Sequence, residues 1–138
     1  MNLQKKIEPL LKKIEKPGRY IGGELNSVLK DPESVRTRFG FAFPDTYEIG
    51  MSFLGLQILY GAMNQEDGIY CERIFAPATD MEALMRQEEI PLFTLETKTP
   101  VREMDFIGFT LQYEMSYTNI LNMLDLGGIP LYANQRTQ

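Results

Sequence analysis

The chain has 138 residues, of which 43% are hydrophobic and 24% are charged, a composition typical of one globular domain with its own core. Its formal net charge of −5 argues against sequence-independent binding to nucleic acid, which needs a basic surface. No apolar run approaches the ~20 residues of a transmembrane helix, and the N-terminus lacks the apolar core of a signal peptide. We therefore expect a cytoplasmic protein with neither a nucleic-acid nor a membrane partner.

The chain has a single cysteine, Cys71, and no histidine. One cysteine cannot form an intramolecular disulfide, and it is too few for an iron–sulfur cluster, which takes about four thiolates. Without histidine, the chain cannot build Ser-His-Asp or Cys-His catalysis or histidine-ligated zinc. We therefore expect no catalytic residue and no metal site within this chain.

Residues 1–37 are predicted to form a helix and an extended lead-in. Four apolar residues recur at helical spacing: Ile7, Leu10, Leu11 and Ile14. Pro9 is expected in the first turn of this helix, and Pro17-Gly18 is expected to end it. The stretch that follows is punctuated by glycine and proline, which predicts a loop or a small hairpin.

From Arg38 onward, predicted strands and helices alternate. Three strands are expected at 38–43, 68–75 and 105–111. Two further short segments, 91–96 and 129–133, are candidate strands. The helices are expected at 52–64, 79–89 and 116–128. The helix at 52–64 is apolar nearly all round, so we expect it to be well buried. The apolar run at 105–111 predicts a strand covered on both faces.

Finer features follow from the same patterns. Thr79 and Glu82 have the spacing of a capping box, and Gly127-Gly128 is a helix stop. The inward faces of the two later helices are predicted to be Met81, Leu84 and Met85, and Ile120, Leu121 and Leu124.

This alternation predicts an α/β fold of the flavodoxin-like or Rossmann-like type, doubly wound around a mainly parallel sheet. Strand 38–43 is expected at the centre of the sheet. Such sheets have about five strands, so we expect this one to be incomplete at its C-terminal side. The predicted division is a lead-in at 1–37 and an α/β domain at 38–138.

Ligands of doubly wound sheets bind beyond the carboxyl ends of the strands. The candidate site residues there are Asp45, Thr46, Tyr47, Gly50 and Ser52 after the first strand, and Thr110, Tyr113 and Ser116 after strand 105–111. Ser52 and Ser116 stand at expected helix N-termini, where they either cap the helix or help to bind an anion. Asp45 either binds a ligand or caps its own turn. The tyrosines either offer a face to a flat ligand or pack.

Three uses of this architecture make different demands on these loops. A phosphoacceptor receiver needs an aspartate at the end of the third strand, but Asp105 lies at its start. A flavodoxin needs a hydroxyl-rich phosphate loop, to which PDTYEIGMS is a loose fit. A cobalamin-binding domain of the best-known type carries D-x-H-x-x-G after its first strand. The stretch from Asp45 to Gly50 has that spacing, with Tyr47 in the histidine position.

Four stretches carry a resemblance to a known family: FAFPDTYEIGMSFLGLQILY, ERIFAPATDMEALMR, IPLFTLE and DFIGFTLQYEMSYTNILNMLDLGGIPL. Together they resemble the N-terminal region of one subfamily of B12-binding-domain radical SAM proteins, over residues 17–131. The resemblance implies a cobalamin-binding-like domain followed by a radical SAM barrel, which would carry a [4Fe–4S] cluster and S-adenosylmethionine. It also implies that the chain is the N-terminal part of a longer protein, with its own downstream domain as its main partner.

Cobalamin is the cofactor that the resemblance implies for this domain. The phenol of Tyr47, with an ordinary pKa near ~10, is a poor cobalt ligand at neutral pH, so we expect it to stack against a corrin or to pack. Two alternatives stay open: a docking domain without a ligand, and an anion- or nucleotide-binding module. Because a neighbouring strand is missing, the chain alone is expected to form a homodimer.

Overall fold

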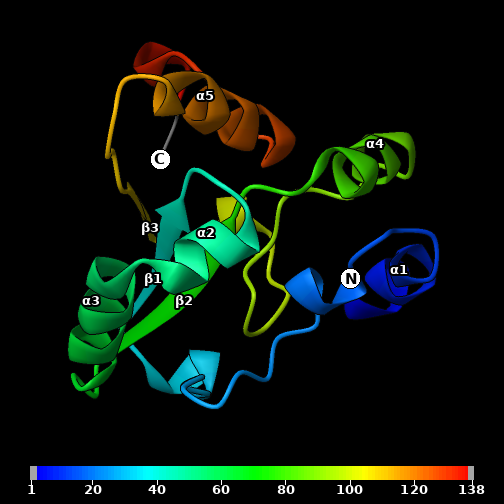
Figure 1. Ribbon diagram of the computed structural model, residues 1–138. Coiled ribbons are helices and arrows are strands. Elements are labelled where there is room, and N and C mark those ends of the chain that lie inside the picture. The colour runs from blue at the N-terminus through cyan, green and yellow to red at the C-terminus, as the bar shows by residue number, and fades with distance from the viewer. Residues whose placement is uncertain (1–2, 137–138) are drawn as a thin grey trace.

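A computed structural model of the chain describes residues 3–136. At its centre lies a three-stranded parallel sheet of order β2-β1-β3, formed by β1 (Thr37–Phe43), β2 (Ile69–Phe75) and β3 (Phe106–Phe109) (Figure 1). In this register Phe39 of β1 lies beside both Cys71 and Phe106. The predicted α/β class, the parallel sheet and the central position of β1 are confirmed.

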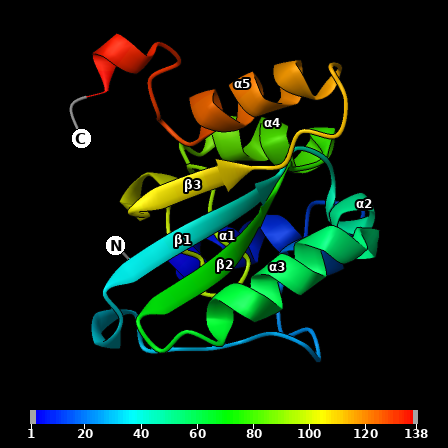
Figure 2. The same cartoon turned by 90° about the vertical axis from the view of Figure 1, so that its left-hand side faces the viewer.

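Helices cover both faces of the sheet (Figure 2). They are α1 (Leu3–Leu11), α2 (Tyr47–Ser52), α3 (Leu54–Asn64), α4 (Thr79–Gln87) and α5 (Ser116–Leu126). Within the described residues, 3-10 turns lie at Pro17–Tyr20, Pro32–Ser34, Val101–Glu103 and Ala133–Gln135. None of the helices within residues 3–136 is long and apolar enough to cross a membrane.

The two faces of the sheet build two separate apolar clusters, because successive side chains of a strand point to opposite faces. On one face, Phe41 and Cys71 pack with Leu56 and Tyr60 under α3. The other face carries the larger cluster, which joins the sheet to α1, α4 and α5 through Ala42, Ile74, Ile7, Met81, Met85 and Met123.

The predicted helix at 52–64 is wrong in its start and in its burial. Phe53 has extended backbone angles (φ −84°, ψ 107°) and separates α2 from α3. Only one face of α3 lies on the sheet, so Leu54 and Ile58 are exposed rather than buried. Among the described residues, no element covers the outer face of α3.

Two predicted strands and part of a third are absent from residues 3–136. Segment 91–96 makes only an isolated antiparallel bridge between Phe93 and Pro100, and 129–133 leads into a 3-10 turn. The third strand is shorter than predicted and lies at the sheet edge, where Phe106 is 62% exposed, so it is not covered on both faces. Its apolar run reflects burial on one face only.

Details of the helices also differ from prediction. Pro9 lies inside α1, which ends at Leu11, well before Pro17. The N-cap of α4 is Ala78, whose side chain cannot cap a helix, so Thr79 and Glu82 do not form the predicted capping box. Glu82 instead accepts a hydrogen bond from Arg86. In α5, Met123 and Leu126 are buried whereas Leu121 is exposed. The predicted stop after α5 is confirmed, with Gly128 at φ +69°.

The middle of β2 carries two buried charges that point to opposite faces of the sheet. The carboxylate of Glu72 accepts hydrogen bonds from Thr94 Oγ1 (2.9 Å) and Thr97 Oγ1 (2.5 Å), and it contacts the guanidinium of Arg38. On the α3 face, the Arg73 guanidinium lies over the ring of Tyr60, 4.3 Å from its centroid. Each buried charge therefore has a partner, as burial of an ion requires.

Candidate functional site at the carboxyl edge of the sheet

Two loops meet where β1 and β3 end, because the carboxyl ends of parallel strands lie at one edge of a sheet. The first joins β1 to α2, and the second joins β3 to α5. Thr110 N donates to the carbonyl of Ala42 (3.1 Å), and Asn119 Nδ2 donates to the carbonyl of Pro44 (2.8 Å). These hydrogen bonds hold the two loops side by side.

An open pocket of about 340 Å³ lies between these loops. Four of the predicted site residues line it: Asp45, Ser52, Tyr113 and Ser116. Apolar side chains supply much of the remaining wall, chiefly Phe43, Ile49 and Phe53. The pocket thus offers an apolar surface with a few polar groups, the composition that small-molecule and cofactor sites share.

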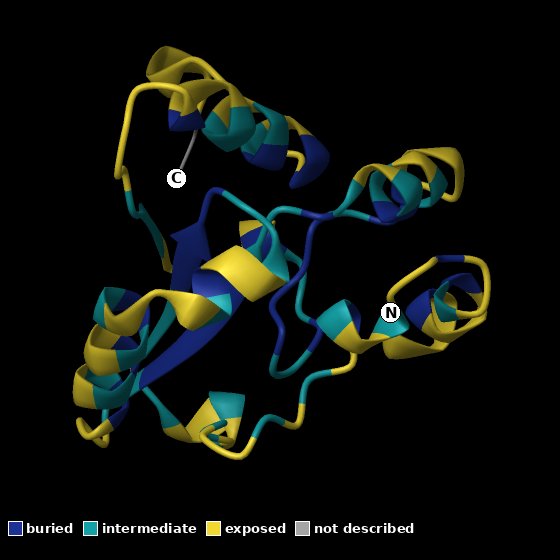
Figure 3. Cartoon of the chain, in the orientation of Figure 1, coloured by how far each residue is buried: buried dark blue, intermediate teal, exposed yellow. Residues whose placement is uncertain are grey.

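Apolar side chains around this pocket face solvent, and we call them the rim surface. They are Ile49, Phe53, Leu54, Leu111, Tyr113, Met115 and Tyr117, with Met115 the most exposed at 78%. Figure 3 shows exposed residues in α2 and in the loop before α5, and Figure 2 shows both segments on the same side of the molecule. Exposed apolar patches of this kind mark interaction sites.

Asp45 and Thr46 serve the local turn. Asp45 Oδ1 accepts a hydrogen bond from Thr46 N (2.7 Å), and the Asp45 carbonyl accepts one from Ala76 N (2.9 Å), which ties the loop to the end of β2. Thr46 is the N-cap residue of α2, but its side chain makes no capping hydrogen bond. Asp45 therefore stabilises its own turn and also lines the pocket.

Tyr47 points into the lead-in segment rather than into the pocket. Its hydroxyl donates to Glu24 Oε1 (2.9 Å), and its ring packs edge-on against Phe75 at 5.6 Å between centroids. Burial raises the pKa of Tyr47 to about 12, and the Glu24 carboxylate adds to the shift. The phenol is therefore neutral and held in place by the fold.

Gly50 has a packing role. A Cβ atom built on it would lie 2.2 Å from the ring of Phe75 and 3.3 Å from the ring of Phe43. Only glycine lets these rings approach the backbone of α2 so closely. The packing of these rings is thus one reason for a glycine at the last position of the Asp45–Gly50 stretch.

The two serines do not cap helices as predicted. Ser52 is the last residue of α2, where its hydroxyl donates to the carbonyl of Glu48 (2.6 Å), because α2 begins before the predicted helix. Ser116 is buried at the start of α5, whose N-cap is Met115. The backbone N–H groups of Ser116 and Tyr117 already donate to the carbonyls of Tyr113 and Glu114. Few N–H groups at this helix start are therefore free for an anion.

Thr110 differs from the other predicted site residues. Its Oγ1 is buried at the end of β3 and has no hydrogen-bond partner within residues 3–136. A buried hydroxyl without a partner costs free energy, about 1–3 kcal/mol, and so calls for an explanation.

Sequence reasoning missed the polar cluster beneath Tyr47. It is centred on the fully buried Arg73, whose Nη2 donates to Ser27 Oγ (2.9 Å) and to Glu24 Oε2 (3.3 Å). The adjacent charges Glu72-Arg73 inside an apolar strand were the available signal, because charges in such a position need buried partners. This cluster anchors the lead-in to the sheet and so orients Tyr47.

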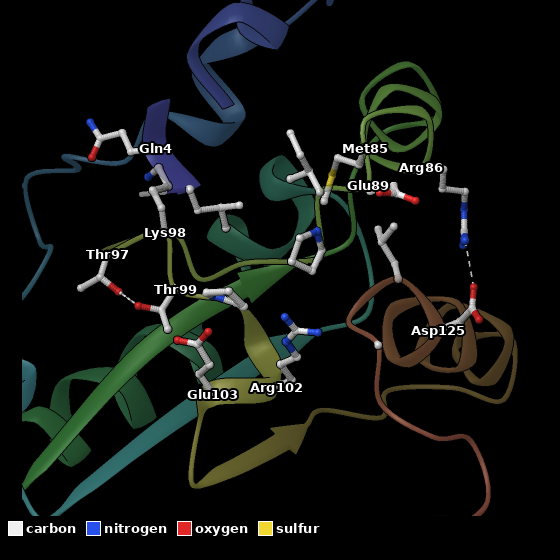
Figure 4. A pocket seen from close by; sticks show the side chains of 16 residues that line it. Gln4, Met85, Arg86, Glu89, Thr97, Lys98, Thr99, Arg102, Glu103 and Asp125 are labelled. Atoms are coloured by element: carbon white, nitrogen blue, oxygen red, sulfur yellow. Dashed lines mark hydrogen bonds and ion pairs between the residues drawn. The ribbon is translucent and has the colours of Figure 1, made fainter. Parts of the chain in front are cut away.

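A larger open pocket, of about 620 Å³, lies near the carboxyl ends of α4 and α5, away from the carboxyl edge of the sheet (Figure 4). Several of its polar groups are already paired. Arg86 donates to Asp125 (2.9 Å), Lys98 Nζ donates to the carbonyls of Ile21 and Leu95, and Thr97 contacts Thr99. Burial lowers the pKa of Lys98. The pairing of these groups leaves fewer of the pocket's polar side chains free to bind a ligand.

The residues present do not fit ligation of cobalt, which the best-known cobalamin-binding domains perform with a histidine. The chain has no histidine, and the phenol of Tyr47 is engaged by Glu24. Within the described residues, no group of three or more His, Cys, Asp or Glu side chains is placed to hold a metal ion.

The comparisons with known proteins agree with the radical SAM part of the expectation. The family model described as radical SAM proteins, N-terminal, matches residues 55–138, which is more than half of the 138-residue chain. The matched region runs from α3 through β2, α4, β3 and α5. No curated protein and no solved structure matches the chain. The chain belongs to the family of N-terminal regions of radical SAM proteins.

Proposed function

We propose that this N-terminal region is a docking module whose rim surface contacts the radical SAM domain of its parent protein. The observation that carries the proposal is the concentration of exposed apolar side chains around the carboxyl edge, including Tyr113, Met115 and Tyr117. Burial of apolar surface is worth roughly 25 cal/mol per Å², so covering the rim surface would favour association. Aromatic residues and methionine are also the types enriched in interface cores.

The docking role explains why the two loops are held firmly while their outer sides stay apolar. The hydrogen bond from Asn119 to Pro44 and the capped turn at Asp45 fix the backbone of the rim. A preorganised surface loses little entropy on binding, which raises affinity. The pocket between the loops would then become one wall of a site shared with the catalytic domain, where its [4Fe–4S] cluster and S-adenosylmethionine react.

Cysteine labelling tests this proposal in the full-length radical SAM protein. Met115→Cys is placed in the rim surface, and Leu25→Cys, at a fully exposed position of the lead-in, is the matched control. The native Cys71 is buried. We expect maleimide to label position 115 about tenfold or more slowly in the full-length protein than in the 138-residue chain, because an interface core excludes water. The control position 25 should be labelled at the same rate in both forms. If position 115 is also labelled at the same rate in the full-length protein as in the 138-residue chain, docking through the rim is contradicted.

A second candidate function is binding of a flat corrinoid at the rim without a side-chain ligand from this chain. The unpartnered Oγ1 of Thr110, the residue that directly follows β3 at the carboxyl edge, favours this candidate. Such a hydroxyl can donate to a cofactor amide. Electron paramagnetic resonance of the Co(II) form of the full-length protein provides the test. We expect no nitrogen superhyperfine splitting from a side chain of this domain, because the candidate has no cobalt ligand in this chain. A nitrogen splitting that is lost when this domain is altered would refute the candidate.

A further inference from the structure

The two edges of the sheet differ in how their backbone groups are satisfied. On the outer edge of β2, the Asn64 side chain bonds both the N–H and the carbonyl of Cys71, each at 2.9 Å. One residue pair further along, Arg73 N donates to Glu96 Oε2 (2.7 Å) and the Arg73 carbonyl accepts from Leu95 N (2.8 Å). The β2 edge is therefore closed to pairing with another strand.

The outer edge of β3 is open. Within residues 3–136, the backbone of Phe106–Phe109 makes no hydrogen bond except to β1. A groove of about 550 Å³ runs beside this edge, lined by Phe106, Ile107 and Phe109 on the strand and by Pro130 and Arg136 on the C-terminal segment. An edge strand with free N–H and C=O groups and apolar neighbours is a template for pairing.

The backbone groups that face outward belong to Ile107 and Phe109. Thr110 N donates to the Ala42 carbonyl, so the backbone N–H and C=O groups of the even-numbered residues of β3 point toward β1. Because these groups alternate along a strand, those of Ile107 and Phe109 turn away from β1.

We infer that β3 pairs with β3 of a second copy of this chain, antiparallel and related by a two-fold axis. The register places Gly108 opposite Gly108 of the second copy and Ile107 opposite Phe109. In this register the outward N–H and C=O groups of both residues in both copies are satisfied by four interchain hydrogen bonds, and the two sheets become one of six strands.

Charge and topology favour a second copy as the partner. Phe106–Phe109 carries no charge, so pairing of the two strands places no like charges of β3 opposite each other. Because the β2 edge is closed, pairing through β3 uses the only open sheet edge among the described residues and stops at two copies. This surface is distinct from the rim surface, so the inference is independent of the proposed function.

Sedimentation equilibrium of the 138-residue chain tests the inference, with Ile107→Pro and the control Ile107→Val. Proline at position 107 removes an N–H group that points away from the sheet, and it breaks no hydrogen bond to β1. Edge strands tolerate proline at such positions. We expect the unaltered chain and Ile107→Val to have twice the mass of one 15.9 kDa chain at micromolar concentration. We expect self-association of Ile107→Pro to be about 10- to 100-fold weaker, from the loss of two interchain hydrogen bonds.

Hydrogen exchange of the unaltered chain provides a second test that needs no variant, in case Ile107→Pro does not fold. We expect the amides of Ile107 and Phe109 to exchange faster on dilution, while the amide of Thr110 stays protected. A monomer with fast exchange at both amides would overturn the inference. Protection independent of concentration would also overturn it, since the edge would then be covered by a segment of the same polypeptide.

Discussion

The carboxylate of Glu96 accepts two hydrogen bonds from Arg73, one from its backbone N–H at 2.7 Å and one from its guanidinium Nε at 2.8 Å. Both side chains are fully buried. One carboxylate thus pairs a buried cation and also occupies the position of a neighbouring strand at the β2 edge. Burial raises the pKa of Glu96, whereas the Arg73 charge opposes that shift.

Glu96→Ala is expected to destabilise the fold strongly. Among the described residues, the substitution leaves the buried Arg73 with Glu24 as its only close carboxylate and leaves the Arg73 N–H without an acceptor. Removing one partner of a buried pair costs about 3–5 kcal/mol. Urea unfolding measures the change, with the exposed Glu88→Ala as the matched control. A loss for Glu96→Ala no larger than that for Glu88→Ala would show that the pair is not important for stability.

Asn64→Ala is expected to lower the free energy of unfolding by about 1–3 kcal/mol, since it leaves the N–H and the carbonyl of Cys71 unsatisfied in the interior. Asn134→Ala, in the exposed C-terminal turn, is the matched control and should stay within about 0.5 kcal/mol of the unaltered chain. Chemical denaturation of the two variants gives both values. Similar stabilities would rule out a role for Asn64 in closing the β2 edge.

Tyr47 is expected to ionise with a midpoint near pH 12, because burial and Glu24 raise its pKa from 10.0 to about 12. Its folded pKa lies above the unfolded value. The stability that the neutral phenol contributes is therefore fully present below pH 10 and is lost as the pH rises toward 12. The difference in phenolate absorbance between the unaltered chain and Tyr47→Phe isolates this residue. A midpoint near pH 10 would mean that the phenol is exposed and not held by Glu24.

The regular part of the fold could be predicted from the sequence. β1 and β2 are apolar runs bounded by turn residues, and the alternation with helices fixes a parallel sheet with right-handed connections. Those rules also place β1 at the centre, as observed. They depend on local pattern and general topology, which a single sequence contains.

The rest depends on contacts between residues far apart in the sequence. The orientation of Tyr47 is set by Glu24, 23 residues earlier, and Arg73 is bonded to Ser27 across 46 residues. The burial of α3 was overestimated because composition does not tell which face of an apolar helix meets the sheet. Ser52 was misplaced because α2 begins at Tyr47, in a stretch that its turn residues predicted to be a loop.

Hydroxyl-radical footprinting of the unmodified full-length protein tests most directly whether the rim surface docks on the radical SAM domain. Methionine and aromatic side chains react readily, so Tyr113, Met115 and Tyr117 report directly on the rim, and the exposed Tyr132 reports on a surface outside it. We expect much slower oxidation of the three rim residues in the full-length protein than in the 138-residue chain, with both forms compared at equal concentration. Equal oxidation of the rim residues in the two forms would show that the rim surface does not dock.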